Sequence, residues 1–160
     1  MDTSFILNFL TEFAYFLIVL AIALVFTLAR GRQAVINLIL GLYLALLISV
    51  EFPYYDQLLG SFDSGIESVI KLIIFAVFTV LATLVCSRIT PDEFREGRFE
   101  SFGKKFILAL SATVLVMIFS FHVLPVTDFL TPGTPIQSLF APEGYFFWWL
   151  LAPLIVLFLV

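Results

Sequence analysis

A chain of 160 residues is long enough for one domain, but this one is 62% hydrophobic and only 12% charged, whereas soluble domains carry about 25% charged residues. This composition excludes an ordinary soluble fold, which could not keep so much apolar surface away from water. The net charge of −4 includes no basic tract for nucleic acid, and one cysteine with one histidine cannot supply the ligands of a usual zinc site. We therefore expect no metal, no cofactor and no nucleic-acid partner.

Long apolar segments follow one another along the chain. The five segments cover residues 9–29, 34–50, 67–87, 105–124 and 144–160. In a bilayer, backbone N–H and C=O groups have no water to bind, so a spanning segment must be a helix or part of a closed barrel. The segments are continuously apolar rather than alternating, which favours helices. The sequence thus predicts one all-α domain in the lipid bilayer, a polytopic bundle of five transmembrane helices.

The first and last segments each allow a second interpretation. Residues 1–12 carry Asp2 and Glu12 and no Lys or Arg, so they lack the basic stretch of a secretion signal, and we interpret the first segment as a retained anchor. The last segment contains Pro153, which removes one helical hydrogen bond. We expect it either to span the membrane fully or to form a tilted, half-inserted helix.

Basic residues gather in the connections between helices one and two and between helices three and four. Seven of the eight lie there: Arg30, Arg32, Arg88, Arg95, Arg98, Lys104 and Lys105. Lys and Arg mark the cytoplasmic side of a membrane protein. We therefore expect the N-terminus outside, a cytoplasmic loop at 88–104, and outer loops at 51–66 and 125–143.

The predicted cytoplasmic loop combines aromatic rings with cations. Thr90, Pro91 and Glu93 have the spacing of a helix start with a capping box. The residues that could contact the inner leaflet or a docked protein are Arg88, Phe94, Arg95, Arg98, Phe102, Lys104 and Lys105. Such a segment can lie on anionic lipid as a connector, and it can also serve as a docking surface for a cytoplasmic partner.

A second group of ionisable residues is expected near the outer ends of helices one to four. Its members are Glu12, Glu51, Glu67, Lys71 and His122. Charges within a span are costly unless they are paired or hydrated, so such residues are functional candidates. One interpretation is a cation or proton site in which Lys71 or His122 titrates. The other is that Lys71 extends outward and pairs with Glu67, its i,i+4 neighbour, while the others lie among headgroups.

Aromatic and small residues mark further features of the predicted bundle. Tyr145, Trp148 and Trp149 open the fifth helix at its outer end, where amphipathic rings favour the headgroup layer. Small residues four apart, which let helices approach closely, are Gly41 with Ala45, Thr79 with Thr83, and Ala109 with Thr113. The proline-rich loop at 125–143 cannot be a regular helix, and we expect it to fold over the outer face as a candidate binding segment.

The stretch "FTLARGRQAVINLILGLYLAL" contains an Arg-Gly turn that leads directly into an apolar helix, and "FPYYDQL" follows as an aromatic outer segment. Over residues 13–90 the chain resembles the colicin V production protein family, small bacterial inner-membrane proteins with an Arg-Gly turn after the first helix. It departs from the family before the fourth helix, where Asp-Arg followed by Gly is typical and "ESFGKKFILAL" stands instead. The resemblance implies an inner-membrane helper without a defined reaction.

No catalytic constellation is readable, since the spans supply mainly hydroxyl groups such as those of Thr27 and Thr113. We expect a non-enzymatic, multi-pass protein of a bacterial cytoplasmic membrane. Its expected role is that of an accessory or scaffold subunit in secretion or cell-envelope maintenance, acting with a protein partner or as a homo-oligomer. The alternative is a small oligomeric transporter or channel that uses the outward-facing ionisable cluster.

Overall fold

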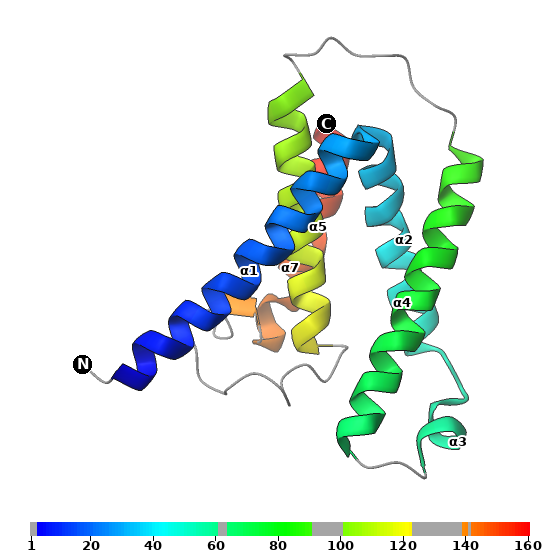
Figure 1. Ribbon diagram of the computed structural model, residues 1–160. Coiled ribbons are helices and arrows are strands. Elements are labelled where there is room, and N and C mark those ends of the chain that lie inside the picture. The colour runs from blue at the N-terminus through cyan, green and yellow to red at the C-terminus, as the bar shows by residue number, and fades with distance from the viewer. Residues whose placement is uncertain (1–2, 61–63, 91–100, 123–138, 141) are drawn as a thin grey trace.

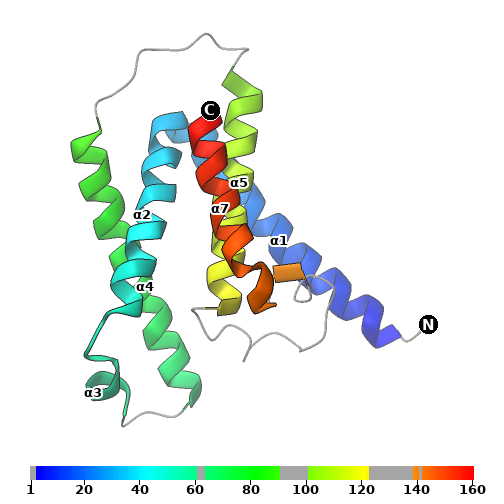
Figure 2. The same cartoon turned by 180° about the vertical axis from the view of Figure 1, so that it is seen from behind.

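The computed structural model describes residues 3–60, 64–90, 101–122, 139–140 and 142–160 (Figure 1). Its helices are α1 (Thr3–Arg30), α2 (Arg32–Val50), α3 (Tyr55–Leu59), α4 (Ser64–Ile89), α5 (Ser101–His122) and α7 (Glu143–Leu159). The five predicted helices are present, and the predicted all-α fold is confirmed. The long helices run alternately up and down, so the connections between consecutive helices lie alternately at the two ends of the bundle (Figures 1 and 2).

Four of these helices are long and apolar enough to cross a membrane. The windows are Phe13–Arg30, Arg32–Val50, Ile66–Ile89 and Phe102–Phe121, of 18 to 24 residues. At about 1.5 Å per residue they reach roughly 27–36 Å, enough for a hydrocarbon core of about 30 Å. Helix α7 has 17 residues. Its length of about 25 Å is short for a perpendicular span.

A single residue, Gly31, joins α1 to α2. Its backbone has φ 86° and ψ 174°, a conformation that is essentially restricted to glycine. Its N–H donates to the carbonyl of Thr27 at 2.9 Å, which closes the end of α1. The predicted Arg-Gly turn therefore reverses the chain in one residue and leaves Arg30 and Arg32 at adjacent helix ends.

Helix α2 lies at the centre of the bundle, where it contacts α1, α4 and α5, and α5 in turn contacts α1 and α7. Helix α4 packs chiefly on α2 and stands at the side of the bundle (Figure 2). The two helices meet where Gly41 of α2 faces Thr83 of α4. Lipid tails are as apolar as side chains, so close van der Waals fit holds such helices together. Of the six small residues that the sequence singled out for packing, Gly41, Ala45, Ala109 and Thr113 are buried, and Thr79 and Thr83 are partly buried.

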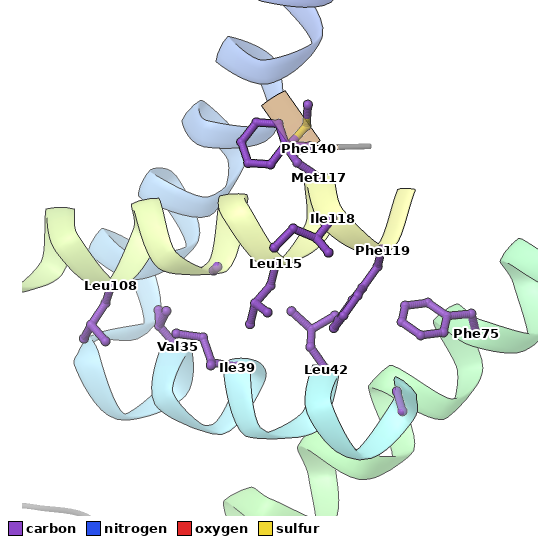
Figure 3. Close-up of a cluster of buried hydrophobic side chains, with 12 residues drawn as sticks. Val35, Ile39, Leu42, Phe75, Leu108, Leu115, Met117, Ile118, Phe119 and Phe140 are labelled. Carbon is purple, nitrogen blue, oxygen red and sulfur yellow. The ribbon is translucent and has the colours of Figure 1, made fainter. Parts of the chain in front are cut away.

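The core lies between α2, α5 and the first half of α4 (Figure 3). Leu42 of α2 and Leu115 and Phe119 of α5 point toward one another there. The ring of Phe75 from α4 meets that of Phe119 edge to face, with centroids 5.7 Å apart. The remaining buried apolar residues of this cluster are Val35, Ile39, Ala45, Leu108, Ala112, Met117, Ile118 and Phe140.

Helix α7 packs on α5 and is also tied to α2 by hydrogen bonds to its backbone. The hydroxyl of Tyr43 donates to the carbonyl of Leu150, and the guanidinium of Arg32 donates to the carbonyl of Val160. Pro153 is buried within the helix and cannot donate a backbone hydrogen bond. Side chains from α2 thus bind α7 carbonyls on both sides of this proline.

The helix bounds differ from the prediction at several ends. Helix α1 begins at Thr3, α4 at Ser64 and α5 at Ser101, all earlier than the predicted spans. The predicted loop at 88–104 therefore loses its last residues to α5, and the predicted outer loop at 51–66 contains α3. Polar residues flanking an apolar run continue the helix because its backbone bonds remain satisfied there.

Two predicted features fall largely outside the described residues: the middle of the 88–104 loop and most of the 125–143 loop. Thr90, which the sequence predicts as the N-cap of a following helix, bonds to the last turns of the preceding helix, and the segment that it was predicted to cap lies outside the described residues. Its N–H and hydroxyl both bond to the carbonyl of Cys86, at 3.0 and 2.8 Å.

Candidate functional site

The charged residues of the described helices separate into two groups at opposite ends of the bundle. The basic end carries Arg30, Arg32, Arg88, Lys104 and Lys105, which lie where α1 and α4 end and where α2 and α5 begin. The acidic end carries Glu51, Glu67 and Lys71, which lie where α2 ends and α4 begins. This separation agrees with the alternation of charge that the topology prediction used.

At the acidic end, the short helix α3 folds back against α2 and α4. The hydroxyls of Tyr55 and Ser49 are 2.8 Å apart, which links α3 to the last turn of α2. The ring of Phe52 contacts those of Tyr55 and Phe78, with centroids 5.0 and 5.4 Å apart. Leu59 is buried. These contacts hold α3 beside the last turn of α2, and the aromatic segment before α3 against the middle of α4.

Glu67 and Lys71 form the ion pair that their spacing predicted. The ammonium Nζ of Lys71 donates to Oε1 of Glu67 at 2.6 Å. The two side chains are 33% and 37% exposed. A pair with this much exposure contributes only about 0.3–0.5 kcal/mol to stability, because water screens it. Its polar groups therefore remain accessible to a ligand.

A pocket of about 220 Å³ opens between α3 and α4 at this ion pair. Its lining residues are Tyr55, Leu59, Gly60, Glu67 and Lys71. Pockets for drug-sized ligands measure about 300–1,000 Å³, so this one suits a small polar group. One wall offers an ammonium and a carboxylate, and the other offers an aromatic ring and an aliphatic side chain. This pocket is the candidate functional site.

Of the five ionisable residues predicted to cluster, the structure brings Glu67 and Lys71 together. Glu51 follows α2 at the same end, but its side chain is exposed and does not line the pocket. Glu12 and His122 belong to α1 and α5, and their side chains lie outside the described part of the structure. Sequence reasoning missed Tyr55, Leu59 and Gly60 as lining residues. The aromatic segment "FPYYDQL" was the available signal, but nothing local indicated that it turns back on α4.

The predicted inner-leaflet segment is described only at its two ends. Arg88 is exposed in the last turn of α4, while Phe102, Lys104 and Lys105 belong to the first turns of α5. These three residues therefore lie on a spanning helix rather than in a separate surface segment. Phe94, Arg95 and Arg98 lie outside the described residues.

The predicted aromatic belt at the start of α7 divides into two parts. Tyr145 and Trp148 are exposed, as rings in a headgroup layer would be. Trp149 instead turns inward, where its indole N–H donates to the carbonyl of Leu139 at 3.0 Å and its ring lies 4.8 Å from that of Phe140.

Hydroxyl groups within the spans bond chiefly to their own helices. Thr27, Thr79, Ser111, Thr113 and Ser120 each donate to the carbonyl four residues earlier, at 2.6 to 2.9 Å. This back-bonding satisfies a hydroxyl without a partner helix. Among the residues that the structure describes, no three His, Cys, Asp or Glu side chains are grouped in a way that could hold a metal ion.

No protein-family model, curated protein or solved structure matches this chain. The four long apolar helices, the shorter apolar α7 and the separation of charge to the two ends define its class. The chain is a polytopic helical membrane protein.

Proposed function

We propose that this protein is a non-enzymatic accessory or scaffold subunit of a bacterial cytoplasmic membrane, where it assists secretion or envelope maintenance by binding another membrane protein. The observation that carries the proposal is the peripheral position of α4. Only 17% of the α4 span is buried within the chain, against 39% of the α2 span and 50% of the α5 span, and the α1 span is 6% buried. A helix held at the side of a bundle in this way offers most of its surface to a partner.

The hydroxyl bonding described above supports a non-enzymatic role, because hydroxyls engaged with their own helices do not form a polar centre for chemistry. The charge separation supports an N-terminus outside and the basic end in the cytoplasm. The resemblance of residues 13–90 to the colicin V production family supports a helper role in the envelope, since the glycine turn that carries it is formed by Gly31.

Cross-linking from α4 tests the partner directly. Val80 is exposed, so a photoreactive residue at this position should cross-link a defined protein in the native membrane. The matched control is Ala82, which lies on the buried side of the same helix and should give no intermolecular product. Cross-links to lipid alone at Val80, together with a purified complex that contains only this chain, would contradict the accessory role.

The second candidate function is a small oligomeric transporter or channel, and the ion-pair pocket at the acidic end favours it. In this role the pocket would be the outward entrance of a pathway built from several copies. The test is the mass of the gently extracted complex, followed by ion flux in liposomes for the wild type and for Lys71→Ala. A homo-oligomer whose flux falls in the variant would support the transporter, and a monomer without flux would contradict it.

A further inference from the structure

The polar groups of the pocket at Glu67 and Lys71 indicate the chemistry of a ligand that neither proposed role names. Lys71 has three N–H donors, of which one bonds to Glu67. The Glu67 carboxylate accepts that bond with one oxygen and has further lone pairs. The pair can therefore receive an anionic group at Lys71 and an N–H donor at Glu67 without separating. A ligand with both groups would lie antiparallel to the pair and form two charge-assisted contacts.

The position of the pocket along the membrane-spanning part of α4 indicates that such a ligand would be a lipid. The α4 span begins at Ile66, so the pair occupies its first two turns. From Leu72 to Val85 the helix carries no charge. The side chains three and seven residues beyond Lys71, on the same helix face, are the half-buried Ile74 and Phe78. Lys71 thus lies at the boundary between the headgroup layer and the acyl chains.

We propose that this pocket binds the headgroup of a zwitterionic phospholipid that carries a primary ammonium, as phosphatidylethanolamine does. Its phosphate binds the Lys71 ammonium, its ammonium donates to the Glu67 carboxylate, and its acyl chains lie along Ile74 and Phe78. Tyr55 and Leu59 form the opposite wall, and the ring of Tyr55 is a suitable neighbour for a cation. The volume of about 220 Å³ admits a headgroup but not the chains.

The same geometry predicts an order among lipids. Phosphatidylcholine keeps both charges but has no N–H to donate to Glu67. Phosphatidylglycerol has no ammonium to donate to Glu67, and its phosphate would lie near the negative charge of that carboxylate. We therefore expect affinity to fall from phosphatidylethanolamine to phosphatidylcholine to phosphatidylglycerol.

The test is retention of each lipid by the purified full chain in detergent, measured by native mass spectrometry over a lipid titration. The wild type should prefer phosphatidylethanolamine over phosphatidylglycerol by about tenfold, which corresponds to one charge-assisted contact. Glu67→Gln should abolish most of this preference, whereas Lys71→Met should lower retention of both lipids, because the phosphates of both bind the Lys71 ammonium. The control is Glu51→Gln, which removes a carboxylate at the same end outside the pocket and should keep the preference.

A charge-swapped variant distinguishes a loss of lipid binding from a loss of folding. Glu67→Lys combined with Lys71→Glu preserves the ion pair and should fold as the wild type does, but it should lose the preference, because the phosphate would bind at position 67, away from Ile74 and Phe78. Equal retention of the three lipids by the wild type would overturn the proposal, and so would an unchanged preference in Glu67→Gln or unchanged lipid retention in Lys71→Met. These measurements need no partner protein, so they are independent of the accessory role.

Soluble phosphoethanolamine carries the same phosphate and ammonium groups as the lipid headgroup. Competition with this compound therefore distinguishes a lipid ligand from a soluble one. We expect millimolar phosphoethanolamine to leave the bound lipid in place, because it has no chains to lie on Ile74 and Phe78. If it binds the lipid-free protein as tightly as phosphatidylethanolamine does, the assignment to a lipid is overturned.

Discussion

Gly41 of α2 and Thr83 of α4 are in direct contact. A Cβ atom built on Gly41 would overlap the hydroxyl oxygen of Thr83 and lie 2.8 Å from its backbone nitrogen. That hydroxyl oxygen is buried and has no hydrogen-bond partner among the described residues. The most extensive helix pair of the bundle is therefore built on a position without a side chain.

Gly41→Ala should destabilise the protein by about 1–3 kcal/mol, because a backbone nitrogen cannot move aside for a methyl group as a side chain can. The measurement is reversible unfolding in mixed micelles followed by circular dichroism. Gly103→Ala is the control, since a Cβ on Gly103 meets nothing within 4 Å. It should be neutral or slightly stabilising, and equal stability of the two variants would contradict the close contact.

Gly31→Ala should also destabilise the protein, by about 1–2 kcal/mol, but for a different reason. A Cβ at Gly31 meets nothing within 4 Å, so the cost arises from the backbone conformation at φ 86° alone. The same unfolding measurement applies, with Gly144→Ala in helical conformation as the matched variant. If Gly31→Ala and Gly144→Ala both have the same free energy of unfolding as the wild type, the turn does not need glycine.

Tyr43→Phe should loosen α7, because it removes the hydroxyl that donates to the Leu150 carbonyl. We expect a loss of about 0.6–1 kcal/mol and faster amide exchange around Pro153, with little change in α4. Tyr54→Phe removes a hydroxyl from an exposed ring and provides the comparison. Unchanged exchange in α7 would argue against this tie between α2 and α7.

Glu67→Gln should leave the free energy of unfolding within about 0.5 kcal/mol of the wild type, because the ion pair is partly exposed and screened. Raising the salt concentration should therefore change the stability of the wild type and the variant alike. A loss of several kcal/mol would instead identify the pair as a structural element of the fold. The unfolding midpoint at low and high salt decides between these outcomes.

The orientation of the bundle predicts opposite labelling of its two ends. In a background with Cys86→Ser, Gln57→Cys should react with an impermeant maleimide on intact cells. Gly103→Cys should react only after permeabilisation, because it lies at the basic end. Both residues are exposed at their helix surfaces. Labelling of both from outside would refute the orientation.

The sequence by itself determined the features that depend on neighbours along the chain. Hydropathy predicted the long helices, the positions of Lys and Arg predicted that charges separate to two ends, and the i,i+4 spacing predicted the Glu67–Lys71 pair. The Arg-Gly turn was readable as a short break between two apolar segments, and only glycine readily adopts the backbone conformation found there. Each of these follows from local chemistry, which the lipid environment makes unusually strict because backbone polar groups must be satisfied within the segment.

Only the tertiary structure decided which helices pack together and what lines the candidate site. All the spans are apolar on most faces, so hydropathy carries no signal for the central position of α2 or the peripheral position of α4. The pocket required α3 to fold back through the Ser49–Tyr55 bond and the burial of Leu59, contacts that no local pattern encodes. In a bilayer, helix association depends on the fit of particular side chains, and that fit exists only once the helices have met.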